Sequence, residues 1–144
     1  MMKVRITAVV TALVCLLLPA AGQAASVLAQ LDAANKAFAK AIMAGDIDYL
    51  VNDYTDDGCI IAPQAPLTCG KDAIRPFWES VVGSKPMNVE LITQSAEQEG
   101  NLAYATGELI ITDAESNTHK SRFVLVFKRV GNAWKLHVDS WTPQ

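Results

Sequence analysis

Apolar residues recur at intervals of three and four between residues 27 and 42, a spacing typical of one face of an amphipathic helix. Ser26 is the expected N-cap of this helix, and Gly45 is its expected C-terminal stop. Asp46 is expected to cap a second, short helix. One face of that helix would carry Ile47, Leu50, Val51 and Tyr54.

A third helical stripe lies between residues 71 and 82. Pro76 is tolerated only near a helix start, where amide protons have no intrahelical partner, so Asp72 is the expected N-cap. Between the second and third helices, the segments 59–62 and 67–69 read as the two short strands of a hairpin.

Beyond residue 86 the chain divides into four runs with the character of strands, at 87–97, 102–112, 119–130 and 133–141. Gly131 and Asn132 separate the last two and form a two-residue hairpin signal. The expected fold is therefore α+β. Three N-terminal helices are segregated from a curved antiparallel sheet, made of a four-strand meander plus the small hairpin.

The last hairpin divides its side chains between two faces. If residue 130 pairs with residue 133, one face is wholly apolar and the other is apolar with polar groups inserted. The apolar face carries Phe123, Leu125, Phe127, Leu136 and Val138. The mixed face carries Arg122, Val124, Val126, His137, Asp139 and Trp141.

The mixed face has two interpretations. A greasy wall with a few polar groups is typical of a small-molecule pocket. The same composition is compatible with a solvent-facing surface, on which Arg122 and Asp139 form a weak ion pair. The hairpin alone does not separate these two possibilities.

The first 24 residues have the pattern of a signal peptide. Lys3 and Arg5 precede an uncharged apolar run that ends at Pro19, and the small residues Gly22 and Ala24 suit a signal peptidase. The alternative is a retained N-terminal anchor. We expect cleavage to leave a domain of residues 25–144 with no stable membrane anchor, located in the periplasm or secreted.

Cys59 and Cys69 are the two cysteines of that domain. A hairpin symmetric about Gln64 places them opposite each other, and an oxidising compartment permits a disulfide between them. Two buried free thiols are the alternative. No further ligands are spaced to complete a metal site with them, so no metal is expected.

Composition narrows the classes of partner. The chain has 144 residues, of which 51% are hydrophobic and 19% charged, a globular balance. Its 12 basic and 15 acidic residues give a net charge of −3. Without a basic cluster beyond the extreme N-terminus, the chain lacks the footprint of a nucleic-acid-binding protein.

Four segments of the chain resemble the nuclear transport factor 2-like superfamily, and in particular its SnoaL-like branch. They are AFAKAIMAGD (37–46), YTDDGCI (54–60), GKDAIRPFW (70–78) and WKLHVDSW (134–141). The resemblance implies a cone, in which a curved sheet wraps three helices around a cavity, and whose convex face often dimerises. Aligned to this family, Val124, Val126, His137, Asp139 and Trp141 fall on the concave side. Phe123, Leu125, Phe127, Leu136 and Val138 would then form the interface of a homodimer.

The best-known enzymes of this superfamily, the ketosteroid isomerases, use an aspartate base, a tyrosine and a second acid. The resemblance puts Ala62, Phe38 and Val124 in those places, so that catalytic set is missing. We therefore expect a domain that binds a small, partly apolar molecule without a cofactor. The alternative is an acid–base enzyme in which His137 is the acid or base and Asp139 orients it. In either case Tyr54, Trp78, Tyr104, Arg122 and Trp141 would help to shape the site.

Overall fold

The computed structural model describes residues 25–144, so the predicted signal peptide lies outside the described residues. Helix α1 (Val27–Ala44) has the predicted caps: the Ser26 hydroxyl accepts a hydrogen bond from the Ala29 amide, and Gly45 adopts φ +70°. Helix α2 (Ile47–Asn52) begins after Asp46, whose carboxylate accepts the Tyr49 amide. Both termini are fixed by local chemistry that is readable in the sequence.

Helix α3 (Lys71–Gly83) differs from the prediction at its start. Its N-cap is Gly70, at φ +83°, and Asp72 lies within the first turn and not at the cap. The prediction of Asp72 as N-cap was wrong because Pro76 sits deeper in the helix than the rule for proline assumed. A glycine is suited to this position since the chain must turn sharply out of the preceding strand.

One six-stranded sheet contains all the strands, in the order β2-β1-β6-β5-β4-β3. The meander consists of β3 (Asn88–Glu99), β4 (Leu102–Thr112), β5 (Thr118–Val130) and β6 (Ala133–Pro143). The small hairpin, β1 (Tyr54–Ile61) and β2 (Thr68–Cys69), joins this meander because β1 pairs in parallel with β6. Tyr54 therefore begins a strand, whereas the sequence pattern placed it on the face of the second helix.

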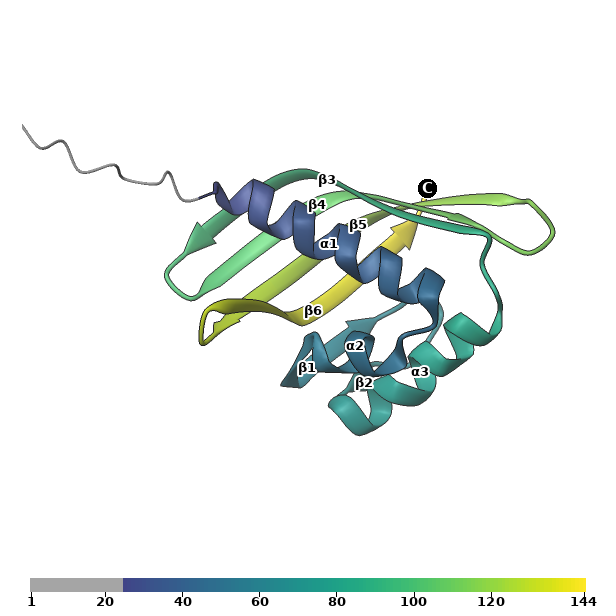
Figure 1. Cartoon of the computed structure of the whole chain (residues 1–144), viewed down its shortest axis with the longest axis horizontal. Coiled ribbons are helices and arrows are strands. Elements are labelled where there is room, and N and C mark those ends of the chain that lie inside the picture. Colours follow the sequence, from purple (N-terminus) through teal and green to yellow (C-terminus); the bar gives the residue numbers. More distant parts are fainter. Residues whose placement is uncertain (1–24) are drawn as a thin grey trace, which may run out of the picture.

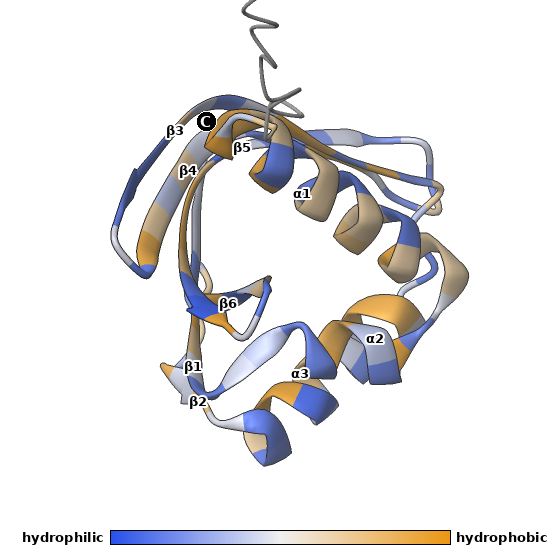
Figure 2. Cartoon of the chain, turned by 60° about the vertical axis from the view of Figure 1, so that its left-hand side comes forward, coloured by the Kyte–Doolittle hydropathy of each residue, from blue (hydrophilic) through white to orange (hydrophobic). Residues whose placement is uncertain are grey.

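The sheet curves around the molecule, and the three helices lie on its concave side (Figures 1 and 2). Helix α1 packs mainly against β3, and α2 and α3 pack on each other next to β1. The core lies between these layers and includes Leu31, Leu50, Ile60, Ile74 and Phe127, each at most 1% exposed. Burial of such side chains is the main force that holds helices and sheet together.

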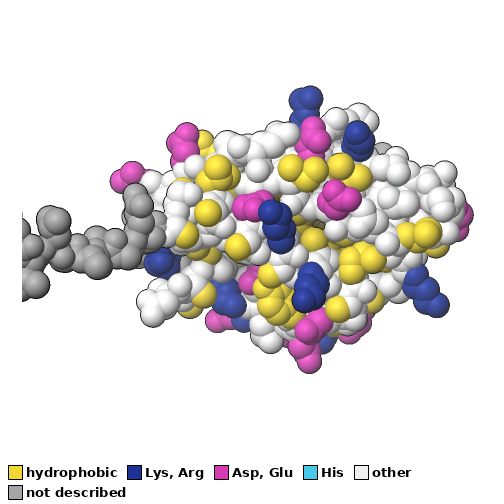
Figure 3. Space-filling view, turned by 45° about the horizontal axis from the view of Figure 1, so that its top comes forward, with side chains coloured by type: hydrophobic (Ala, Val, Ile, Leu, Met, Phe, Trp, Pro, Cys, Tyr) yellow, Lys and Arg dark blue, Asp and Glu magenta, His cyan; other side chains and the backbone are white. Residues whose placement is uncertain are grey.

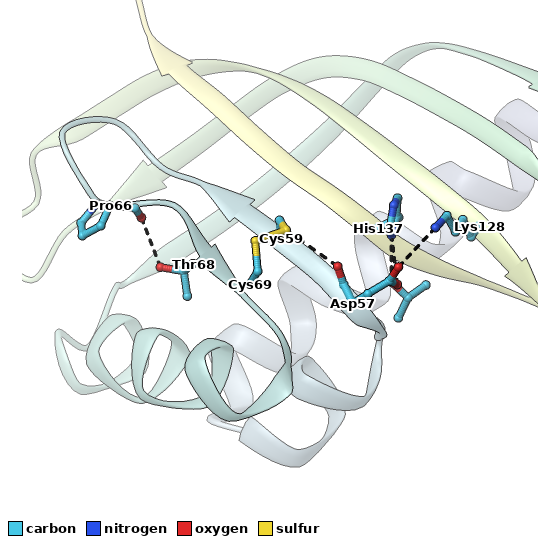
Figure 4. Close-up of a disulfide and its surroundings, with 8 residues drawn as sticks. Asp57, Cys59, Pro66, Thr68, Cys69, Lys128 and His137 are labelled. Atoms are coloured by element: carbon cyan, nitrogen blue, oxygen red, sulfur yellow. Dashed lines mark hydrogen bonds and ion pairs between the residues drawn. A yellow bond between two sulfur atoms is a disulfide. The ribbon is translucent and has the colours of Figure 1, made fainter.

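The disulfide between Cys59 and Cys69 closes the small hairpin, as the sequence predicted. The two residues are direct partners in the β1–β2 ladder, with Cα atoms 4.1 Å apart. Figure 4 shows the bond at the edge of the sheet. It fixes the short strand β2 to β1 and, through Gly70, the start of α3.

The β5–β6 hairpin follows the predicted register only near its turn. Pairs from Val130–Ala133 to Phe127–Leu136 are as expected, but a bulge then shifts the register so that Val126 pairs with Val138. His137 is the extra residue. Because side chains alternate with a period of two, one inserted residue exchanges the two faces for the rest of the strand.

Gly107 permits a close approach between strands. It lies opposite Thr93 on β3, where that ladder has its own register shift, and opposite Phe123 on β5. A Cβ atom at this position would overlap the carbonyl oxygen of Ile92 and lie 2.6 Å from Cζ of Phe123. The Phe123 ring therefore occupies the space that a side chain at position 107 would need.

Acidic and basic side chains are interspersed on the face shown in Figure 3, with hydrophobic atoms scattered between them. Ion pairs such as Lys36–Asp32 belong to this exposed surface. Within residues 25–144, none of the helices combines the length and the hydrophobicity needed to cross a membrane.

Candidate functional site

A cavity of about 380 Å³ opens on the concave side of the sheet, between α1, α3 and strands β3 to β6. Its wall is almost entirely apolar, and exposed residues of α3 such as Ser80 and Ser84 lie at its mouth. The lining comprises Asn35, Phe38, Ile42, Phe77, Trp78, Ser80, Val81, Ser84, Pro86, Val89, Leu91, Leu109, Ile111, Leu125, Leu136, Asp139 and Trp141. A broader groove of about 800 Å³ between α1 and β3 is lined in part by Asp32, Lys36, Lys40 and Glu90, and has no buried polar group.

Asp139 is the one ionisable residue that lines this cavity. It is only 6% exposed, and its Oδ2 accepts a hydrogen bond of 2.5 Å from the Tyr54 hydroxyl. In the part of the chain that the structure describes, Oδ1 has no hydrogen-bond partner. Burial raises the pKa of Asp139 to about 6, and the bond from Tyr54 only partly opposes this rise. The carboxyl group is therefore able to take up or release a proton near neutral pH.

Tyr54 is held beneath Asp139 by strand β1 and by aromatic packing. It is 1% exposed and packs edge-on against Phe38, at 6.1 Å between ring centroids. Burial and the charge of Asp139 raise its pKa well above the ordinary value. The hydroxyl therefore stays protonated and remains a donor to the carboxylate.

Trp78 supports Tyr54 from the other side. Its indole N–H is buried and does not reach hydrogen-bond geometry with any described residue, but it lies near enough to Tyr54 to oppose part of the rise in that residue's pKa. Its ring meets Phe38 at 5.1 Å and Phe77 at 5.2 Å, and Phe77 continues to Trp141 at 6.1 Å. A chain of edge-to-face aromatic rings thus lines one side of the cavity.

His137 faces away from the cavity. Its Nδ1 lies 3.0 Å from the Thr55 hydroxyl and 3.5 Å from a carboxylate oxygen of Asp57, whose side chain is 72% exposed. Lys128 points to the same carboxylate, as Figure 4 shows. The prediction that His137 faces the cavity was wrong, because the bulge at this residue turns it outward and turns Asp139 inward.

The other predicted lining residues divide between the two faces. Tyr54, Trp78 and Trp141 lie at the cavity. Val124 is 51% exposed and Tyr104 is 38% exposed, both on the outer face together with Val126. Arg122 lies on that outer face beside Glu108 and makes no pair with Asp139, so this expected contact was also wrong.

The apolar set that was expected to form a dimer interface instead packs on the helices. Phe123, Leu125, Phe127 and Leu136 are 1–3% exposed within the single chain. Only Val138, which the bulge turns outward, is not buried. A homodimer through this set is therefore excluded, since the chain's own core already covers it.

Asn35 belongs to the site and was missed by the sequence analysis. It is 2% exposed, lines the cavity and donates from its side-chain amide to the Thr93 hydroxyl at 2.9 Å. It lies four residues after Leu31, within the apolar stripe of α1. A polar residue in an otherwise apolar stripe was the signal that could have identified it.

Within residues 25–144, no three His, Cys, Asp or Glu side chains lie close enough together to hold a metal ion. What the site offers is one carboxyl group of raised pKa, oriented by a tyrosine, at the wall of an apolar cavity. Such a group can bind a polar atom of a ligand or exchange a proton with it.

The sequence between residues 31 and 139 matches the model of the SnoaL-like domain family. The chain belongs to this family. No curated protein matches it by sequence. Its fold is that of the nuclear transport factor 2-like superfamily, a cone formed by an unclosed curved sheet and three helices.

Solved structures of several relatives share this SnoaL-like fold. A proposed dehydratase of the nuclear transport factor 2-like family from Streptomyces avermitilis is 18% identical, with a TM-score of 0.70 over 81% of this chain and 95% of that chain. A ketosteroid isomerase-like protein from Erwinia carotovora atroseptica is 19% identical, with a TM-score of 0.69 over the same shares. A protein of unknown function from Pseudomonas putida is 23% identical, with a TM-score of 0.67 over 81% and 87%. At these identities the likeness describes the fold alone.

Proposed function

We propose that this SnoaL-like domain binds a small, mostly apolar molecule in its cone cavity and that Asp139 fixes the orientation of that molecule. The observation that carries this proposal is a buried carboxyl group with one unpaired oxygen at the wall of an otherwise apolar cavity. A polar group that is buried without a partner is costly, and a ligand that supplies the partner removes the cost.

The test of binding uses the neutral fluorescent dye N-phenyl-1-naphthylamine and two variants on α3. Ser80→Trp places a large side chain at the mouth of the cavity, whereas Glu79→Trp changes an exposed neighbour that does not line it. We expect the dye to bind the wild type and Glu79→Trp, and to lose at least tenfold in affinity for Ser80→Trp. Equal binding to all three proteins would contradict a ligand in this cavity.

We also propose that the domain acts in the periplasm or outside the cell. The signal-peptide pattern of residues 1–24 and the Cys59–Cys69 disulfide both suit an oxidising compartment. Mass spectrometry of the protein from a periplasmic extract should find a chain that begins near Ala25 and is two hydrogens lighter than its reduced form. A full-length, reduced chain recovered from the cytosol would refute this location.

A second candidate function is acid–base catalysis on the bound molecule, favoured by the pKa of about 6 at Asp139. Oδ1 would take a proton from a C–H or O–H group of the ligand while Tyr54 continues to donate to Oδ2. The test incubates a bound carbonyl ligand in D₂O and follows deuterium incorporation by mass. Incorporation should disappear in Asp139→Asn and persist in His137→Ala; no incorporation with the wild type leaves binding as the function.

A further inference from the structure

We propose that the ligand of the cavity is an organic cation, an alkylammonium group on an apolar body, whose charged end pairs with Asp139. This inference rests on the binding function proposed above and names the class of ligand. It follows from three features of the cavity: its charges, its aromatic wall and the free oxygen of its carboxylate.

The charges of the cavity have one sign. Asp139 is the one charged residue among those that line it, and the remaining polar lining residues, Asn35, Ser80 and Ser84, are neutral. No lysine, arginine or histidine lines it. A carboxylate or phosphate ligand would meet a like charge without a compensating cation, and burying an unpaired charge is strongly unfavourable. The cavity therefore selects against anions.

The aromatic wall favours a cation over a neutral molecule. Phe38, Phe77, Trp78 and Trp141 line the cavity together with Asp139. The faces of aromatic rings carry partial negative charge, which attracts ammonium groups, most strongly where water is excluded. Sites that combine such rings with one carboxylate are suited to an ammonium end attached to a hydrocarbon body.

The free oxygen of Asp139 gives the ammonium its partner. Oδ2 is occupied by Tyr54, and Oδ1 has no partner among residues 25–144. A charge-assisted hydrogen bond from an ammonium to Oδ1 would satisfy the carboxylate and offset its desolvation. Because the ammonium stabilises the ionised form, its binding should displace a proton wherever Asp139 is still protonated.

The pH dependence of binding follows from the groups that face Asp139. Strand β1 contributes Tyr54 and apolar Ile60, strand β5 contributes apolar Leu125 directly opposite, and α1 and α3 present no ionisable side chain to the cavity. Asp53 acts only at a distance, through its charge on Tyr54. Asp139 is thus the group whose titration controls an ammonium ligand, which itself keeps its charge below about pH 9.

The experiment compares three probes that share a phenyl body: 2-phenylethylamine, neutral 2-phenylethanol and anionic phenylacetate. Each competes with N-phenyl-1-naphthylamine for the wild type, Asp139→Asn and the control Asp57→Asn, which removes an exposed carboxylate outside the cavity. At pH 7.5 we expect the amine to bind at least tenfold more tightly than the alcohol, and phenylacetate most weakly. The preference should vanish in Asp139→Asn and persist in Asp57→Asn.

The pH arm measures the same competition at pH 7.5 and pH 5. Protonation of Asp139 leaves only the ionised fraction competent, so the affinity for the amine should fall by about tenfold while that for the alcohol stays level. An amine that competes no better than the alcohol overturns the inference but leaves the binding function standing, because the dye still reports the cavity. If neither dye nor probes bind, both proposals fall.

Discussion

Two aspartates on neighbouring strands show how the faces of this sheet differ. Asp139 on β6 is buried at the cavity, and burial raises its pKa to about 6. Asp57 on β1 is exposed on the outer face, where the Thr55 hydroxyl, followed by the charges of Lys128 and His137, lowers its pKa. The inner face therefore makes a carboxyl group reactive near neutral pH, while the outer face keeps one permanently ionised.

The strongest way to test this division is to truncate one side chain on each face of β5. Phe127→Ala removes a ring that is 1% exposed and should lower the free energy of unfolding by about 3–5 kcal/mol. Val124→Ala, at a side chain 51% exposed, should change it by less than about 0.5 kcal/mol. Urea denaturation of both variants measures the difference; similar losses would mean that the faces are assigned incorrectly.

The next largest effect concerns the charge of Asp139. Since folding raises its pKa from 3.8 to about 6, the folded state favours the protonated form, and this contribution to stability is lost as the pH rises through about 6. Asp139→Asn has no such loss. Its stability relative to the wild type should therefore increase by roughly 3 kcal/mol between pH 4 and pH 8.

Denaturant unfolding at the two pH values checks this prediction. Asp57→Asn is the matched control, because the pKa of Asp57 is lowered in the folded state and its replacement should give no gain at high pH. A flat difference between Asp139→Asn and the wild type across this range would show that the carboxylate is not desolvated.

Tyr54→Phe tests the support of the buried carboxyl group. It removes the hydrogen bond to Oδ2 of Asp139 without changing the packing against Phe38, and should cost about 1–3 kcal/mol of stability. Because that bond favours the ionised carboxylate, the pKa of Asp139 should rise further. Carbon-detected NMR titration of the Asp139 carboxyl measures the shift, and a lower pKa would be inconsistent with this geometry.

His137→Ala is expected to have the smallest effect. Its partners Thr55 and Asp57 lie on the outer face, where such pairs contribute about 0–1 kcal/mol. Stability should change within that range, and dye binding should match the wild type. A tenfold loss of binding in titrations with N-phenyl-1-naphthylamine would restore His137 to the site.

The sequence was informative wherever local chemistry determines structure. The caps at Ser26, Gly45 and Asp46 and the partnership of Cys59 with Cys69 were all predicted from residue type and spacing. The fold class followed from the order of periodic segments and from the resemblance to known cones. These features depend on interactions between residues that are close in the sequence.

The candidate site was predicted only in part, for a physical reason. The turn at Gly131 set the correct register as far as Leu136, but nothing in the local pattern marked the extra residue at His137. The wholly apolar face of β5 should have been assigned to the core, since burial of Phe123 and Phe127 outweighs any alignment of polar residues. Asp139 and Trp141 were correctly placed at the cavity, although the assumed register was not the one that brings them there.

The close approach at Gly107 has a consequence for the interpretation of mutational scans. This residue contacts no part of the cavity, yet any side chain there would force Phe123 and the backbone of Ile92 apart and alter the bend of the sheet. Substitutions at 107 should therefore abolish ligand binding as completely as changes at the carboxylate itself. A survey that scores activity alone would count a purely architectural glycine among the ligand contacts, and only a parallel readout of folded protein would separate the two.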